Sequence, residues 1–363
     1  MKHNRFNRIK DTFKTITDGL DYKEVQNLLK KEMPEVYSFY VNRMDEPDLK
    51  GKSLRGKFQF GRKLFKRFLM ELSPARRIMY IISLLVFFEA ILAGSFGWGL
   101  VGFFLLNLLI ALELADKITS NEELSVASEI QNSLLPKNPP KFDNYEISCY
   151  SETAKSVGGD YYDFILKENN LILAIGDISG KGMAAAIHMV QVQALFKYIL
   201  DSHSSLKDVL SHLNDNLIKL FKPGTFFTIN LASIKQDGSV QFCRAGHLPV
   251  IYFSRKEEKC TNLTPKGIGI GLCTNGLFNT SLEEINIIPE QGDVLIFFTD
   301  GVTEAMNGYL MEYGEERLKA AVKNNAYKSA QGIKSSIIES IKRFTINAPV
   351  YDDITLIVLK KNL

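Results

Sequence analysis

Cysteine and histidine are scarce in this sequence, which has four cysteines and five histidines among its 363 residues. The cysteines stand far apart, without a C-x-x-C pair, at Cys149, Cys243, Cys260 and Cys273. Such spacing argues against both a zinc site and a disulfide framework. We therefore expect free thiols in a reducing compartment.

Standard nucleotide-binding motifs are also lacking. The segment GDISGKG, residues 176–182, has three residues between its first two glycines where a P-loop has four, and Gly182 follows Lys181 where a P-loop has Ser or Thr. The segment GIGIG, residues 267–271, lacks the strand-to-helix setting of a dinucleotide fingerprint, so a flexible glycine loop is the better interpretation. No nucleic-acid partner is expected.

Apolar residues, in contrast, are plentiful at 45% of the chain, enough for one full-sized domain and a smaller module.

The net charge of +3 conceals an asymmetry, because residues 1–78 contain 19 Lys and Arg against 10 Asp and Glu, and the remainder contains 25 Lys and Arg against 31 Asp and Glu. We expect residues 1–77 to form a basic, mainly helical cytoplasmic region, with a helix over residues 21–44 broken near Pro34. Residues 55–72 either lie on an anionic membrane surface or form a solvated basic helix.

Two long apolar runs follow this basic region. Residues 78–94 read IMYIISLLVFFEAILAG and residues 99–115 read GLVGFFLLNLLIALELA, separated by a break that contains Trp98. Each run is close to the length that crosses a bilayer, and basic residues precede the first. Residues 78–115 therefore predict a transmembrane helical hairpin whose turn, with Trp98 as an interface anchor, lies outside. A buried helical hairpin is the alternative, and Glu89 is the residue that a membrane span accommodates least well.

A linker, residues 116–140, connects the second apolar run to the rest of the chain. In it Leu124, Ala127, Ile130 and Leu134 recur at helical spacing. Prolines end this helix and mark a domain boundary, at Pro136, Pro139 and Pro140. The apolar stripe spans barely two heptads, so a helix docked on the following domain and a helix that forms a homodimer are equally compatible with it.

Short strands and acidic residues dominate after Tyr145. β-rich runs such as NLILAIGDIS and DVLIFFTD alternate with two helical segments that begin near Gly182 and Ser205, which indicates an α+β fold. Acidic residues lie at the edges of these runs, at Asp160, Asp177, Asp300, Asp352 and Asp353. One Asp beside a Gly is more often a turn residue. Several together would repel one another unless a divalent cation neutralised them, and hard oxygen ligands suit Mg²⁺ or Mn²⁺.

Five ordered motifs carry a resemblance: GGDYYDF, GDISGKGMAAA, AGHLP, FFTDGVTEA and DDITLIV. They resemble the metal-dependent protein phosphatases of the protein phosphatase 2C superfamily and, more narrowly, their bacterial SpoIIE-like branch. The resemblance covers about residues 125–363 and includes SEIQNSLLP of the linker. It implies that residues 141–363 form a two-sheet antiparallel β-sandwich flanked by helices, with metals held between loops at one edge.

The resemblance also implies a ligand set for two Mn²⁺ or Mg²⁺ ions. Asp160 and Asp177 match the family's first two acids, with Asp177 bridging the metals and the backbone carbonyl of Ile178 completing one coordination sphere. Asp300 and Asp352 match the two acids on the other metal. Asp353 is added to the set at a position where many eukaryotic relatives have Asn.

The mechanism implied by the resemblance is attack of a metal-activated water on phosphorus, without a covalent intermediate. The sequence agrees, because it has no C-x5-R loop. His247 in AGHLP is interpreted as a structural turn residue in preference to a general acid. The phosphate-binding Arg of eukaryotic relatives has no counterpart, since Lys155 is the only basic residue in the stretch SETAKSVGGD.

Two functions follow from this interpretation. In the first, the chain is a protein serine/threonine phosphatase at the cytoplasmic (inner) membrane, with its catalytic domain in the cytoplasm and control through the linker helix. Its substrate would be a phosphorylated regulator of an anti-sigma switch. In the second, the chain is a catalytically silent, membrane-tethered binding module. The intact acids Asp160, Asp177, Asp300 and Asp352 favour the enzyme.

Overall fold

The structure is a computed structural model that describes residues 62–63, 65–70, 72–94, 96–346, 348 and 350–362. The helix expected over residues 21–44 lies outside the described residues. The chain divides into two compact units after Ile118, and each is described by itself.

The first unit contains two apolar helices, α5 (Pro74–Ala93) and the first part of α6 (Phe96–Leu134). Pro74 begins α5, and Gly94, in the left-handed conformation with φ 62°, ends it. Arg76 near the start of α5 forms ion pairs with Glu113 at 3.0 Å and Asp116 at 2.7 Å on α6. The two apolar runs thus form an antiparallel helical hairpin.

Small residues let the two helices of this hairpin approach closely. A Cβ on Gly102 would lie 3.2 Å from both the Ser83 carbonyl oxygen and the Phe87 amide nitrogen, and Ser83 and Ala90 are buried. Many large apolar side chains around this contact are exposed. Trp98 lies in the first turn of α6, so the connection between the helices is shorter than the break in the sequence suggested.

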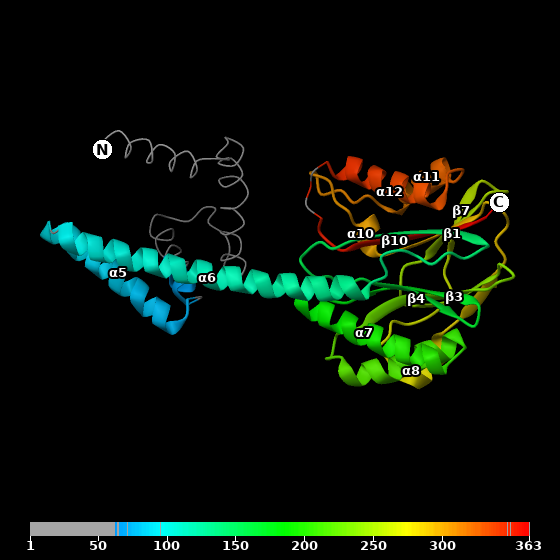
Figure 1. Ribbon diagram of the computed structural model, residues 1–363, viewed down its shortest axis with the longest axis horizontal. Coiled ribbons are helices and arrows are strands. Elements are labelled where there is room, and N and C mark those ends of the chain that lie inside the picture. The colour runs from blue at the N-terminus through cyan, green and yellow to red at the C-terminus, as the bar shows by residue number, and fades with distance from the viewer. Residues whose placement is uncertain are drawn as a thin grey trace, which may run out of the picture. The chain divides into compact units, whose positions relative to one another are not determined.

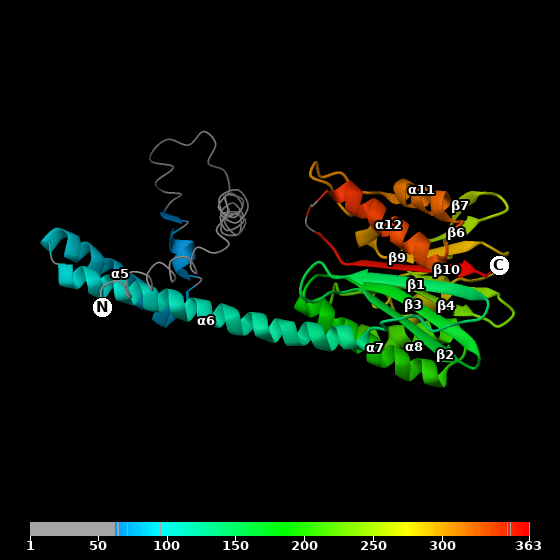
Figure 2. The same cartoon turned by 45° about the horizontal axis from the view of Figure 1, so that its top comes forward.

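The second unit is a β-sandwich of two five-stranded antiparallel sheets with helices on both outer faces (Figures 1 and 2). One sheet has the order β1-β10-β9-β6-β7 and consists of β1 (Tyr145–Glu152), β10 (Ile354–Lys361), β9 (Val294–Phe298), β6 (Val250–Ser254) and β7 (Lys259–Leu263). The other has the order β2-β3-β4-β5-β8 and consists of β2 (Tyr161–Lys167), β3 (Asn170–Ile178), β4 (Phe227–Ile234), β5 (Val240–Ala245) and β8 (Glu284–Ile287).

Helices cover the two outer faces. Those against the β3 sheet are α7 (Met183–Ser202), α8 (Leu206–Leu220) and the short α9 (Asn275–Ser281), and those against the β10 sheet are α10 (Asp300–Thr303), α11 (Glu315–Asn325) and α12 (Ala330–Thr345). The first residues after Gly182 and Ser205 begin α7 and α8, as the sequence predicted. The predicted α+β fold with a flanked two-sheet sandwich is confirmed.

Alternation along the strands explains why the sandwich has three apolar layers. Leu171, Leu173 and Ile175 of β3 face the layer between the sheets, whereas Ile172 and Ala174 face the helices α7 and α8. Both faces of such a strand are buried, so its sequence is a continuous run of apolar residues. Because neighbouring strands run antiparallel, residues that precede one strand and residues at the end of its neighbour lie at the same edge of the sandwich.

Candidate active site

Strand pairing brings the acids of the two sheets to a common edge. Asp160 directly precedes β2 and Asp177 lies at the end of β3, and these strands pair with Tyr161 opposite Gly176. In the other sheet Asp300 follows β9 and Asp352 lies just before β10. The antiparallel turns therefore place all four predicted acids at the ends of neighbouring strands.

These carboxyl groups lie close enough for the charge of each to raise the pKa of its neighbours. Burial, followed by the charges of Asp300, Asp352 and Asp353, raises the pKa of Asp177 to about 7. Burial and Asp352 raise the pKa of Asp300. Carboxylates that raise the pKa of one another in this way favour binding of a cation, which relieves their mutual repulsion.

Asp160 is held by two hydroxyl groups. Its Oδ2 accepts hydrogen bonds from Thr299 Oγ1 at 2.8 Å and Thr355 Oγ1 at 2.6 Å. The side chain is buried, and burial raises the pKa of Asp160 well above its usual range against the lowering effect of these two bonds. Asp160 thus ties the start of β2 to the ends of β9 and β10.

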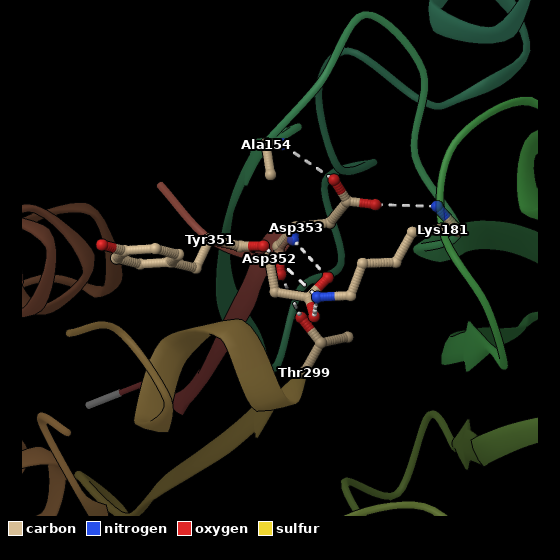
Figure 3. A network of polar contacts seen from close by, with 7 residues as sticks. Ala154, Lys181, Thr299, Tyr351, Asp352 and Asp353 are labelled. Carbon is tan, nitrogen blue, oxygen red and sulfur yellow. Dashed lines mark hydrogen bonds and ion pairs between the residues drawn. The ribbon is translucent and has the colours of Figure 1, made fainter. Parts of the chain in front are cut away.

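Asp353 is held by backbone amides (Figure 3). Its Oδ1 accepts a hydrogen bond from the Ala154 amide at 2.8 Å, and its Oδ2 accepts one from the Gly159 amide at 2.7 Å. A Cβ on Gly158 would collide with this carboxylate. Both oxygens of Asp353 are therefore used to fix the loop that carries Asp160.

Gly159 lies close against two of the predicted metal ligands. A Cβ on Gly159 would lie 3.0 Å from the Ile178 carbonyl oxygen and 3.1 Å from Asp177 Oδ1. The absence of a side chain thus leaves these two oxygens open on one side. Hard oxygen donors such as these fit Mg²⁺ or Mn²⁺, and Asp300 and Asp352 supply further carboxylates of the same kind.

Lys181 also enters this cluster, and sequence reasoning did not assign it there. Its Nζ lies 2.5 Å from Asp352 Oδ2 and 3.3 Å from the Tyr351 carbonyl oxygen (Figure 3). Within the described part of the chain, no three His, Cys, Asp or Glu side chains are already gathered as metal ligands. The available signal was a basic residue inside the acidic motif GDISGKG.

His247 is buried below the acidic edge and contacts both sheets. Its Nδ1 lies 2.8 Å from Thr228 Oγ1, and its Nε2 lies 3.1 Å from the Phe298 carbonyl oxygen. Because a carbonyl oxygen can only accept, Nε2 carries the proton and Nδ1 accepts from the Thr228 hydroxyl. Burial lowers the pKa of His247 to about 4. The interpretation of His247 as a structural residue is consistent with this geometry.

The end of α6 docks on the same edge. The Gln131 side chain is buried, donates to the Gly158 carbonyl oxygen at 2.6 Å and accepts from the Gly158 amide at 3.1 Å. Gln193 of α7 donates to the Leu134 carbonyl oxygen at 2.6 Å. Ile130, in contrast, is 56% exposed. The last turns of the linker helix therefore pack on the sandwich, while part of the apolar stripe faces solvent.

Comparison with known proteins places this geometry in a family. The family described as Stage II sporulation protein E (SpoIIE) matches residues 167–362. The phosphoserine phosphatase RsbU of Bacillus subtilis (strain 168) is 30% identical over 250 residues, which are 66% of this chain and 70% of RsbU. Protein IcfG of Synechocystis sp. is 28% identical over 287 residues, and the match spans 44% of its length.

Solved structures show the same fold. The SiaA-PP2C domain of Pseudomonas aeruginosa superposes with a TM-score of 0.61 at 17% identity, over 68% of this chain and 99% of that domain. The PP2C phosphatase domain of Bacillus subtilis SpoIIE, solved with a fragment of its regulatory domain, gives a TM-score of 0.51 at 22% identity, over 61% of this chain and 64% of that one. With two antiparallel sheets, flanking helices and acids at one edge, this chain belongs to the SpoIIE family of PP2C-type phosphatases.

Proposed function

We propose that this chain hydrolyses phosphoserine or phosphothreonine in a protein, with divalent cations held by Asp177, Asp300, Asp352 and the backbone carbonyl of Ile178. The observation that carries the proposal is the shared edge at which these oxygens meet, beside the close approach of Gly159 to two of them. Relatedness to a phosphoserine phosphatase at 30% identity supports the same reaction.

The residues have separate tasks in this proposal. Bound Mg²⁺ or Mn²⁺ would supply a water of lowered pKa and neutralise phosphate oxygens. Asp160 and Asp353 stay in the predicted ligand set, and their hydrogen bonds give them a further task, which is to orient the loop and the strand ends around the other ligands. Hydrogen bonds of this kind hold metal ligands in place. A nucleophilic side chain is not required.

The substrate and the place of action belong to the proposal as well. The substrate is a phosphorylated regulatory protein of an anti-sigma switch, a role supported by the resemblance to the SpoIIE-like branch. The chain acts at the cytoplasmic membrane, to which the hairpin formed by α5 and α6 anchors it. Of the two predicted spans, the second is apolar and long enough to cross a membrane, at residues 96–113 with 11% of that window buried, and the first is not. Among the described helices α7 of the sandwich, residues 183–202, is also apolar and long enough, with 44% of it buried.

A comparison of two strains tests this proposal. Phosphoproteomes of a deletion strain complemented with the wild-type chain or with Asp177→Asn should differ at phosphoserine or phosphothreonine sites that accumulate only with the variant. The purified chain should hydrolyse p-nitrophenyl phosphate in proportion to bound Mn²⁺. Wild-type protein that binds Mn²⁺ without turning over this ester, in a strain whose phosphoproteome is unchanged, would instead indicate the catalytically silent binding module.

Asp177→Asn and Asp300→Asn should abolish Mn²⁺-dependent hydrolysis and leave the domain folded. Each acid holds a cation and caps no turn in this proposal, and replacing it removes one of several mutually repelling carboxylates. Denaturation of the metal-free variants, compared with wild type, supplies the folding control. An Asp177→Asn protein that unfolds normally and keeps full turnover would remove the metal assignment.

A further inference from the structure

The position of Lys181 suggests a task that goes beyond pairing with Asp352. Lys181 lies in the loop between β3 and α7, and its side chain reaches across to the segment before β10 (Figure 3). The charges of Asp300 and Glu304 also act on this ammonium group, and its charge partly opposes the burial that raises the pKa of both acids. A single flexible cation thus stands among the carboxylates.

The loop around Lys181 is built to move without disturbing the core. The side chain is 56% exposed. Gly180 and Gly182 on either side have φ of +104° and +74°, and a Cβ on either would meet nothing within 4 Å. Glycines in this conformation suit a loop that packs against no neighbour. Lys181 can therefore change partner at little cost.

Charge determines which partner Lys181 takes. In the structure its ammonium group neutralises Asp352. A divalent cation held by Asp352 and Asp300 would neutralise the same carboxylates and repel the ammonium group, because like charges a few ångströms apart repel strongly in a partly buried site. The displaced ammonium group remains tethered at the edge of the cluster. The anion that enters there during the reaction is the phosphate group of the substrate.

We propose that Lys181 exchanges Asp352 for the phosphate group of the substrate and thereby orients it, an inference that rests on the proposed phosphatase function. A lysine ammonium group is a common phosphate ligand, with three donors on a flexible stem. The chain lacks the phosphate-binding Arg of eukaryotic relatives at the corresponding place. Lys155, the basic residue that precedes Asp160 in the sequence, is exposed and is the rival candidate.

Metal binding gives the first test. Calorimetric titration of the full-length chain with Mn²⁺ should show tighter binding by Lys181→Met than by wild type, because the ammonium group no longer competes for Asp352. Lys181→Arg, which keeps the charge, should stay close to wild type. Lys197→Met is the matched control, since Lys197 also pairs with an aspartate, Asp163 at 3.2 Å, and is 50% exposed. It should leave Mn²⁺ affinity unchanged.

Phosphate binding gives the second test, with a change in the opposite direction. Inorganic phosphate titrated into the Mn²⁺-loaded full-length chain should bind Lys181→Met about 10- to 100-fold more weakly than wild type, the effect of losing one charge-assisted hydrogen bond. KM for p-nitrophenyl phosphate should rise more than kcat falls. Mere structural damage would weaken the binding of Mn²⁺ and phosphate together.

The outcomes separate this inference from the proposed function. Tighter Mn²⁺ binding with weaker phosphate binding in Lys181→Met supports the inference, even if the wild-type chain binds phosphate without hydrolysing an ester. Unchanged phosphate affinity in Lys181→Met, in a wild-type enzyme that is active, overturns it. Loss of phosphate affinity in Lys155→Met alone would also overturn it.

Discussion

At the scale of single residues, the glycines of the VGGD segment decide how closely the acids can approach. Gly158 lies against the Asp353 carboxylate, and Gly159 lies against the Asp177 carboxylate and the Ile178 carbonyl oxygen. A larger residue at either position would displace an oxygen that the site uses. Neither glycine adopts a positive φ, so they are required here for space and not for backbone conformation.

Replacing Gly159 with alanine should weaken Mn²⁺ binding by about 10-fold or more, the range seen when groups around metal ligands are changed. The new methyl group would press on Asp177 Oδ1 and the Ile178 carbonyl oxygen, which would have to shift by a few tenths of an ångström. Calorimetric titration measures the change. Gly276→Ala is the control, because a Cβ there meets nothing within 4 Å. Equal Mn²⁺ affinity in both variants would show that the two oxygens next to Gly159 do not hold the metal.

His247 should make the metal-free protein sensitive to acid. Its pKa is lowered from 6.5 to about 4 in the folded state, so the folded protein holds it neutral. The stability gained by holding His247 neutral is fully present above pH 6.5 and is lost as the pH falls towards 4. By linkage the loss reaches up to about 3 kcal/mol.

Urea denaturation in excess chelator, at pH 7 and pH 4.5, tests this prediction against His247→Gln. Glutamine can still donate to the Phe298 carbonyl oxygen but does not titrate. The stability advantage of wild type over the variant should therefore shrink as the pH falls. An advantage that stays constant would mean that the pKa of His247 is the same in the folded and the unfolded protein.

How far the site was predictable also depends on single residues. Asp177 lies at the end of an apolar strand, Asp300 follows one and Asp352 precedes one, and these positions are visible in the sequence. The hydrogen bonds of Asp160 to Thr299 and Thr355 join residues far apart in the chain, as do those of Asp353 to the backbone, so these contacts emerged only from the fold. The reach of the Lys181 side chain to Asp352 likewise depends on a contact between distant loops.

At the scale of elements, the short apolar stripe of the linker helix left two alternatives open, docking on the following domain and pairing with a second chain, and the structure has features of both. Gln131 and Leu134 lie against the sandwich, whereas Val126 and Ile130 are each 56% exposed. The docked face depends on a polar residue, which an apolar periodicity cannot reveal. The exposed face remains available for a second chain, so the proposed homodimer stays a prediction.

Gln131→Ala should lower both stability and Mn²⁺-dependent turnover. It would leave the amide and the carbonyl oxygen of Gly158 without partners, at a cost of about 1–3 kcal/mol for each buried group. The loop that carries Gly159 and Asp160 would then lose its anchor. Thermal denaturation and turnover at saturating Mn²⁺ are the measurements. Asn132→Ala, an exposed neighbour on the same helix, should change neither.

Control of catalytic activity by the linker helix can be tested by changing the rotational register in which two linker helices are joined. Residues 116–363 fused to a dimeric coiled coil in successive registers should differ in turnover, because a coupling of ~1 to 3 kcal/mol changes activity roughly 5- to 150-fold. Ile130→Asp and Leu134→Asp should reduce the most active register. Equal turnover in every register, unaffected by either substitution, would mean that the linker is a passive tether.

Not all of the helices that flank the sandwich were predictable from the sequence. Strands of the sandwich and the starts of α7 and α8 follow from apolar runs and the residues that bound them. The helix α12 buries Ile333, Ile337 and Ile341 at helical spacing but has few other apolar residues. The reason for its single apolar face is visible only in the fold, where that face packs against β1 and β10.

At the scale of the whole molecule, the chain joins an apolar hairpin to a catalytic sandwich through one continuous helix, α6. Ion pairs of Arg76 with Glu113 and Asp116 lie at one end of the hairpin, and Gly94 turns the chain at the other. Exposed apolar side chains cover both helices between these ends. Contiguous apolar surface is unfavourable in water, and this exposure is the observation on which the proposed membrane hairpin rests.

If residues 78–115 cross the membrane as a hairpin, the basic front and the sandwich lie on the same, cytoplasmic side, and the chain around Trp98 lies outside. Arg76, Arg77 and the basic residues before them should stay inside, as positive charges near membrane spans do. The full-length chain should sediment with membranes and resist extraction by high salt. A cysteine introduced as Ser95→Cys should react with an impermeant thiol reagent in intact cells, whereas one introduced as Ser202→Cys in the sandwich should react only after lysis. Both serines are compared in a variant whose native cysteines are replaced. Soluble full-length protein, or Ser95→Cys that stays unlabelled until the cells are broken, would show that the two helices pack on protein instead of lipid.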